Sequence, residues 1–124
     1  MFPCREYLQL AEEWSRKPDE AHQRCAVSRA YYACFHRVKE FAEQKGESFG
    51  ASGLAHDEVS AFLNNNPDRE LQLLGTMQAR LKRNRRVCDY EAMVRNVSGI
   101  AAKSLLDAGR IFEVVDGRSK NRST

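Results

Sequence analysis

Apolar residues recur every three or four positions through each long segment of this chain, and no stretch shows the strict alternation of a half-buried strand. Spacing of three and four gathers apolar side chains on one face of an α-helix. The clearest stripe lies between residues 18 and 44 and comprises Val27, Tyr31, Cys34, Phe35, Val38, Phe41 and Ala42. The sequence therefore predicts an all-α fold whose helices bury these stripes against one another.

Prolines, glycines and capping residues divide the chain into five predicted helices. They are expected at residues 3–16, 18–44, 56–63, from 67 through Cys88, and at 91–115. The stretch KGESFGASGLA (45–55) carries three of the seven glycines and predicts a loop. Asn66 and Pro67 provide a cap and a first turn for the fourth helix.

These elements predict one domain and no internal repeat. We expect an antiparallel bundle of four long helices and one short helix over residues 1–117, followed by a basic, disordered tail at 118–124. A chain of 124 residues with 42% hydrophobic residues is long enough to bury such a core.

Composition favours a cytoplasmic protein with no membrane span, no metal and no cofactor. No apolar run approaches the roughly 20 residues that cross a bilayer, and the N-terminus lacks the features of a signal peptide. The four cysteines show no Cys-x-x-Cys pair and are expected to be reduced, buried thiols: Cys4, Cys25, Cys34 and Cys88.

The most unusual stretch is RLKRNRRVCDYE (80–91), which places five basic side chains in twelve positions although the net charge is only +3. Arg85 follows Leu81 by four residues and precedes Cys88 by three, so it lies on the apolar seam of its helix. A buried, unpaired arginine would be costly, so Arg85 must meet an acid, a cleft or a partner chain. The candidate nucleic-acid-binding residues are Arg80, Arg83, Arg85 and Arg86.

The residues alone leave three interpretations of this run open. It can be a solvated helix end, where cations are favoured by the helix dipole, a surface that binds nucleic acid, or an active site. Each of two histidines lies near a charged residue on its predicted helix. His36 shares a helical face with Arg29, and His56 precedes Asp57 in the first turn of the short helix, where we expect a capping role. No nucleophile with an identifiable base and no phosphate-binding loop is present.

Three segments in order resemble the HEPN domain family, an all-helical family of higher eukaryotes and prokaryotes. SRAYYACFH (28–36) is similar to its aromatic helix, AHDEVSAFL (55–63) to its His-led helix, and RNRRVCDYE (83–91) to its arginine-bearing segment. The resemblance implies an RNA-linked role. Active HEPN proteins are metal-independent ribonucleases of toxin–antitoxin, CRISPR and anti-phage systems, and they usually dimerise so that two motifs face one cleft.

The family motif is an arginine, often followed by asparagine, then a histidine and, two residues later, a tyrosine. On this chain the resemblance places Arg83 and Asn84 at the first positions, Cys88 at the histidine and Tyr90 at the tyrosine; a shifted register uses Arg85 with Tyr90. Histidine suits acid–base chemistry near neutrality, whereas a thiol with a pKa of about 8.5 donates poorly to oxygen.

The resemblance therefore leads to three functional hypotheses. The first is a non-catalytic or weakly catalytic module that binds RNA or a nucleotide in a toxin–antitoxin or defence-type system. The second is an active metal-independent endoribonuclease that uses Arg83, Asn84 and Tyr90, with a histidine from elsewhere in the chain. The third is a dimerising partner of a nucleotidyltransferase-type antitoxin, in which Tyr90 would receive the nucleotide.

Overall fold

The structure, a computed structural model, describes residues 2–50 and 54–122, the last three by their backbone only. These residues form five helices and no strand, so the prediction of an all-α fold is confirmed. The helices are α1 (Cys4–Ser15), α2 (Glu20–Gln44), α3 (Leu54–Asn64), α4 (Arg69–Tyr90) and α5 (Val97–Arg122).

The lengths of the helices differ from the prediction. Three are long, with 25, 22 and 26 residues in α2, α4 and α5. Two are short, because α1 has 12 residues and α3 has 11. None of the described helices is both long and apolar enough to cross a bilayer.

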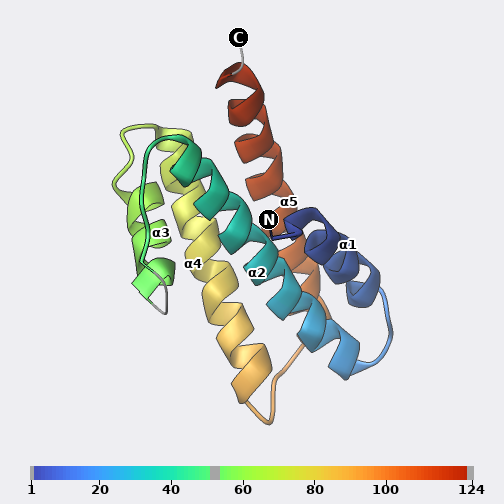
Figure 1. The fold of residues 1–124 in the computed structure, drawn as a ribbon. Coiled ribbons are helices and arrows are strands. Elements are labelled where there is room, and N and C mark those ends of the chain that lie inside the picture. Colours follow the sequence, from blue (N-terminus) through green and yellow to red (C-terminus); the bar gives the residue numbers. More distant parts are fainter. Residues whose placement is uncertain (1, 51–53, 123–124) are drawn as a thin grey trace.

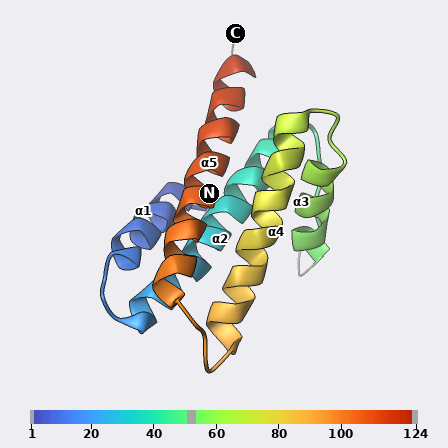
Figure 2. The same ribbon diagram turned by 180° about the vertical axis from the view of Figure 1, so that it is seen from behind.

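Helix α2 lies at the centre of the bundle. It packs against α1, α4 and α5, while α3 packs mainly against α4. In Figure 1 the chain runs upward in α2, downward in α4 and upward again in α5. Seen from behind, α5 lies between α1 and α4 (Figure 2). This arrangement brings the start of α3 beside the C-terminal half of α4, where the basic run lies.

The core forms on the stripe that the sequence predicts. All seven apolar residues of the α2 stripe are buried, and five of them join side chains from every other helix in one cluster. The largest fully buried side chains include Tyr31, Phe41, Leu63, Leu74 and Ile111. Burial of apolar side chains of this size contributes roughly 1.5–3 kcal/mol each, which makes α2 the element on which the others assemble.

The two best-formed helix starts depend on aspartate caps. Asp19 accepts a hydrogen bond from the His22 backbone N–H at 3.1 Å and begins α2. Asp68 does the same for the Glu70 N–H at 2.9 Å. Asn66, the predicted cap of α4, instead accepts from the Asp68 N–H at 3.0 Å and so shapes the turn before the helix.

The last helix begins later and ends later than predicted. Residues 91–96 form a connection that ends at Asn96, whose φ of 55° is left-handed, and α5 starts at Val97 rather than at 91. The predicted boundary at 117 falls inside α5, so residues 118–122 continue the helix instead of forming a tail.

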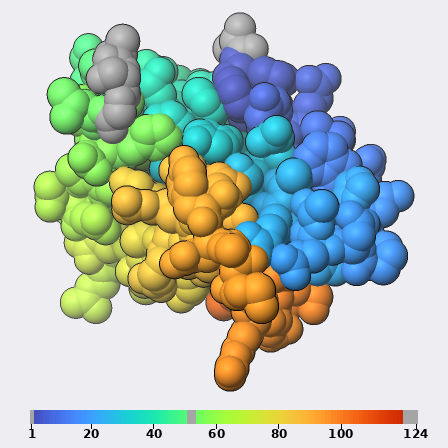
Figure 3. Space-filling model, turned by 90° about the horizontal axis from the view of Figure 1, so that it is seen from below, coloured from blue at the N-terminus to red at the C-terminus, as the bar shows by residue number. Residues whose placement is uncertain are grey.

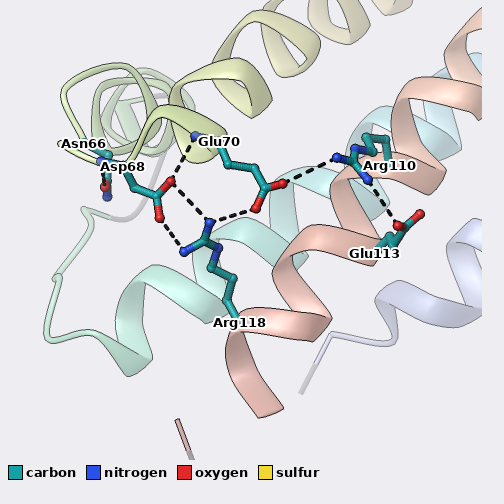
Figure 4. Close-up of polar contacts among 6 residues, drawn as sticks. All are labelled: Asn66, Asp68, Glu70, Arg110, Glu113 and Arg118. Atoms are coloured by element: carbon teal, nitrogen blue, oxygen red, sulfur yellow. Dashed lines mark hydrogen bonds and ion pairs between the residues drawn. The ribbon is translucent and has the colours of Figure 1, made fainter. Parts of the chain in front are cut away.

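Ion pairs explain this extension (Figure 4). Arg118 pairs with both Asp68 and Glu70 at the start of α4, the latter at 2.7 Å. Arg110, two turns earlier in α5, also reaches Glu70 at 3.4 Å. On the other side, Arg37 donates to the Ser119 hydroxyl at 3.1 Å. Although single surface ion pairs contribute little, these contacts act together on one helix end and hold it against its neighbours.

The close approach of α3 to α4 depends on Gly75. A Cβ at this buried position would lie 3.3 Å from the Leu63 Cβ and 2.2 Å from the Asn64 Oδ1. We expect Gly75→Leu to lower the free energy of unfolding by about 1–3 kcal/mol, because α3 must move away. Urea denaturation measures this change.

Gly109→Leu is the matched control, since nothing lies within 4 Å of a Cβ at that position on α5. It should raise stability by up to about 1 kcal/mol through helix propensity alone. An equal change in the free energy of unfolding for the two variants would show that Gly75 is not needed for helix packing.

Candidate functional site

The basic run occupies the C-terminal half of α4, and its side chains point toward three different neighbours. Arg80 points to α5, where it makes a bidentate contact with the buried Asp107 at 2.7 and 2.8 Å. Asn84 also faces α5, at 3.5 Å from the Ser104 hydroxyl. Both side chains therefore serve the packing of α4 on α5. The predicted motif positions are not brought together.

Cys88 is the second motif position that the structure removes from the surface. It is buried in a small apolar cluster with Val27 and Ala101, and burial raises the pKa of its thiol. The thiol stays protonated and lies away from solvent, so Cys88 cannot supply an acid–base group there. A histidine at this position would have to displace packed side chains, so the substitution would not restore the family motif.

Arg85 is the residue around which a candidate site is built. Its side chain is 15% exposed and lies with the guanidinium carbon 5.5 Å from the Tyr31 ring centre, 5.4 Å from that of Tyr32 and 5.9 Å from that of Tyr90. It also donates to the Asp89 carboxylate at 3.3 Å. Of the three environments that the sequence allows for Arg85, the structure provides an acid and an aromatic pocket within the chain.

The environment of Arg85 leaves one donor unsatisfied. Its Nε is buried and has no hydrogen-bond partner among the described residues. Burial by itself lowers the pKa of the guanidinium. The hydrogen bond to Asp89 and the nearby Tyr32 raise the pKa by more than burial lowers it, so the net shift is upward and the group stays charged. A charged group that is partly desolvated and not fully paired is well suited to an anionic ligand.

His56 joins this cluster from the first turn of α3. Its Nδ1 lies 2.5 Å from the Tyr31 Oη, and its ring stacks on Phe35 with the centres 4.0 Å apart. Burial lowers its pKa below the ordinary 6.5, and the positive charges of Lys82 and Arg85 lower it further. His56 is therefore neutral at pH 7. The expected helix-capping role is not what its ring does.

A surface hollow of about 570 Å³ opens beside this cluster, and we call it the lower hollow. It is lined by His56, Asp57, Lys82, Arg85, Arg86 and Tyr90. Lys82 contacts Asp57 at 3.4 Å, whereas Arg86 makes no ion pair in the part of the chain that the structure describes. Asp57 opposes Lys82 and Asp89 opposes Arg85, so Arg86 leaves the wall with one positive charge in excess. Tyr90, 76% exposed, adds an accessible aromatic ring at its edge.

Arg24 of α2 holds the end of α4 that carries Asp89 and Tyr90. Its guanidinium donates to the carbonyls of Cys88, Glu91 and Ala92, at 2.9, 2.5 and 3.1 Å. The first bond satisfies a carbonyl that the C-terminus of α4 leaves without a partner, and the other two fix the connection that follows the helix. In the view from below, this end of α4 lies between α3 and the start of α2 (Figure 3). The position of Tyr90 at the lower hollow thus depends on a residue 66 positions earlier.

Sequence reasoning missed the residues that α2 and α3 contribute. Tyr31 and His56 were recognisable, one on the α2 stripe and one at the start of a helix, but nothing in their spacing joins them to Arg85. Arg83 keeps its predicted exposure, but it lies apart from the lower hollow and lines a neighbouring one with Ser60.

The arrangement can bind an anion and can move a proton. Lys82, Arg85 and Arg86 supply positive charge, and His56 supplies a neutral imidazole in the same hollow. No group of three or more His, Cys, Asp or Glu side chains that could hold a metal occurs among the described residues. Comparison of the chain with protein-family models, with curated proteins and with solved structures finds no match.

The lowered pKa of His56 makes the stability of the fold depend on pH. Below pH 6.5 the unfolded chain takes up the proton before the folded one, so the free energy of unfolding decreases as pH falls toward the folded-state pKa. His36, whose pKa is also lowered by burial, adds to the same trend. Urea denaturation at pH 8 and pH 5.5 should therefore give a lower stability at pH 5.5.

His56→Gln should remove part of this pH dependence, and His36→Gln should remove a separate part. An NMR titration of the imidazole signals measures the pKa of each histidine and so shows how much of the pH dependence each one contributes. A His56 pKa at or above 6.5 would contradict the environment described for it.

Proposed function

We propose that this chain is a HEPN-like module that binds RNA or a nucleotide through the lower hollow and the exposed arginines beside it. The observation that carries the proposal is the grouping of Lys82, Arg85 and Arg86 with the exposed ring of Tyr90 around one hollow. A phosphate needs the cations, and a base or ribose needs the ring, so one hollow offers both halves of a nucleotide their partners.

The chemistry favours a phosphate over a carboxylate peptide as the anion. Three of the four cations along this edge of α4 are arginines (Arg83, Arg85 and Arg86), and the planar guanidinium binds phosphate oxygens in pairs. Among the described residues, Arg83 and Arg86 make no ion pair, although nearby acids occupy Lys82 and Arg85. Arg80 is excluded from this surface because Asp107 holds it. Free guanidiniums at the rim and a buried one behind them fit a ligand with several phosphate oxygens.

Removing the two unpaired arginines tests the proposal. We expect Arg83→Ala/Arg86→Ala to lower the slope of log K against log salt for a single-stranded RNA by about 1.4, since each phosphate contact on a single strand contributes about 0.7. Fluorescence anisotropy at several salt concentrations measures the slope. The fold should be unchanged, because both side chains are exposed.

Arg16→Ala/Arg69→Ala is the matched control, because it removes the same charge from exposed positions on other parts of the surface. An equal loss of slope in both double variants would mean that the RNA responds to net charge and not to this hollow.

An active metal-independent endoribonuclease is the second candidate, and the position of His56 favours it. When Nδ1 donates its proton to the Tyr31 oxygen, Nε2 can accept the proton of a ribose 2′-hydroxyl. The 2′-oxygen then attacks phosphorus, the 5′-oxygen leaves as a hydroxyl with a proton from water, the His56 imidazolium returns its proton to water, and a 2′,3′-cyclic phosphate remains. Arg85 would stabilise the charge that develops on the phosphate. In this form the shifted register, Arg85 with Tyr90, replaces Arg83, Asn84 and Cys88.

Cleavage of RNA in the presence of EDTA tests this candidate. His56→Gln should reduce any cleavage by about 10²–10⁴-fold, as loss of one acid–base group does. The His36→Gln variant, which alters a histidine outside the hollow, should cleave at the wild-type rate. If His56→Gln cleaves as fast as wild type, His56 is not the missing catalytic histidine.

The third candidate is a homodimer that pairs with a nucleotidyltransferase-type antitoxin. The high exposure of Tyr90 and of Met93 near it in sequence favours a protein contact or a modification at this end of α4. Arg85 no longer argues for dimerisation, because its partners lie in its own chain. Light scattering at high micromolar concentration should give twice the mass of one chain, and the mass of a single chain would exclude the homodimer.

A further inference from the structure

A second hollow of about 490 Å³, which we call the upper hollow, adjoins the lower one. It is lined by Ser60, Ala79, Lys82, Arg83, Arg86 and Val87. Lys82 and Arg86 line both hollows, so they form the wall between them. Each hollow has a volume in the range of about 300–1,000 Å³ that small-molecule sites occupy.

The helix geometry shows how the two hollows are aligned. Ser60 follows His56 by four residues, and Ala79, Lys82 and Arg86 follow one another by three and four, so each set lies on one face of its helix. In Figure 1, α3 and α4 lie side by side and run in opposite directions. The two hollows therefore follow one another along the α3–α4 groove, about one helical turn apart.

The two hollows differ in chemical character. The lower hollow holds the titratable groups His56, Asp57 and Tyr90. The upper hollow has small or apolar walls in Ala79 and Val87, with a hydroxyl at Ser60 and the guanidinium of Arg83. Walls of this kind suit the face of a base, on which an arginine can stack.

We infer that the α3–α4 groove binds two successive nucleotides of a polynucleotide chain. The phosphodiester between them lies at the wall formed by Lys82 and Arg86, one nucleotide occupies the lower hollow, and the base of the next occupies the upper hollow. The inference rests on the proposed function and goes beyond it, because it selects a polynucleotide chain over a free mononucleotide.

The charges of two possible ligands distinguish this arrangement from a general attraction for phosphate. A nucleoside monophosphate carries close to two negative charges near neutral pH, whereas a dinucleotide with one phosphodiester carries one. Binding by charge alone would favour the mononucleotide. Tighter binding of the dinucleotide requires a second contact, and the upper hollow provides it.

The experiment compares three probes with the whole chain by calorimetry at low salt. They are adenosine 5′-monophosphate, adenosine 3′-monophosphate and the adenine dinucleotide ApA, in which a 2′-O-methyl group on the first ribose prevents cleavage. We expect ApA to bind about tenfold more tightly than either monophosphate, which is ~1.4 kcal/mol and lies in the range that one stacked base contributes.

Ala79→Leu fills the upper hollow without changing charge, and Ala79 is exposed, so the fold should tolerate it. It should remove most of the dinucleotide's advantage and leave unchanged the affinity for adenosine 3′-monophosphate, whose base lies in the lower hollow when its phosphate is at the wall. Ala102→Leu makes the same change at an exposed position on α5 and should alter neither affinity.

Three outcomes are distinguishable. A dinucleotide advantage that Ala79→Leu removes supports the two-nucleotide groove. Equal affinities, or an advantage that Ala79→Leu leaves intact, overturn this inference while the proposed function stands. Failure of all three probes and of longer single-stranded RNA to bind overturns both.

Discussion

A charged guanidinium on the apolar seam of α4 sets the main constraint on this fold. Arg85 lies where the periodicity of the helix demands an apolar residue, and it can lie there only if other elements surround it with groups that tolerate a charge. Three tyrosine rings and the Asp89 carboxylate do so. Two of the rings come from α2, so the contact also fixes how α4 packs on the central helix. The Arg85 Nε is buried without a partner, and the exposed 15% of the side chain lines the lower hollow.

Helix geometry divides the basic run into parts with different roles. Because successive residues on an α-helix are turned by about 100°, five cations in seven positions cannot share one neighbour. Arg80 meets the buried Asp107 on α5 and stabilises the bundle. Lys82 and Arg86 face α3, Arg83 extends the same surface, and Arg85 lies between the tyrosines. Composition counts these five residues alike, but Asp107 holds Arg80, and only the other four line the two hollows.

Two distant contacts then decide what that surface can do. The stacking of His56 on Phe35 and its bond to Tyr31 bring a neutral imidazole to the lower hollow. The bonds from Arg24 to three carbonyls hold the end of α4 so that Tyr90 stays at the edge of the same hollow. Gly75, with no side chain, lets α3 approach α4 closely enough for the groove to form. The proposed binding and the proposed proton transfer thus depend on the same packing of α3.

The sequence by itself determined the all-α fold, the buried stripe of α2, the end of α2 before residue 45 and the cluster of five cations on α4. Periodicity, caps and glycines act over a few residues, so they can be read directly from the order of the chain. Only the tertiary structure decided that Arg80 and Asn84 turn toward α5, that α5 extends past 117, and that His56 and Tyr31 meet near Arg85. Those outcomes depend on side chains that lie far apart in the chain, from 20 positions for Asn84 and Ser104 to 82 for Arg37 and Ser119. The packing of helices, not local spacing, sets their distances.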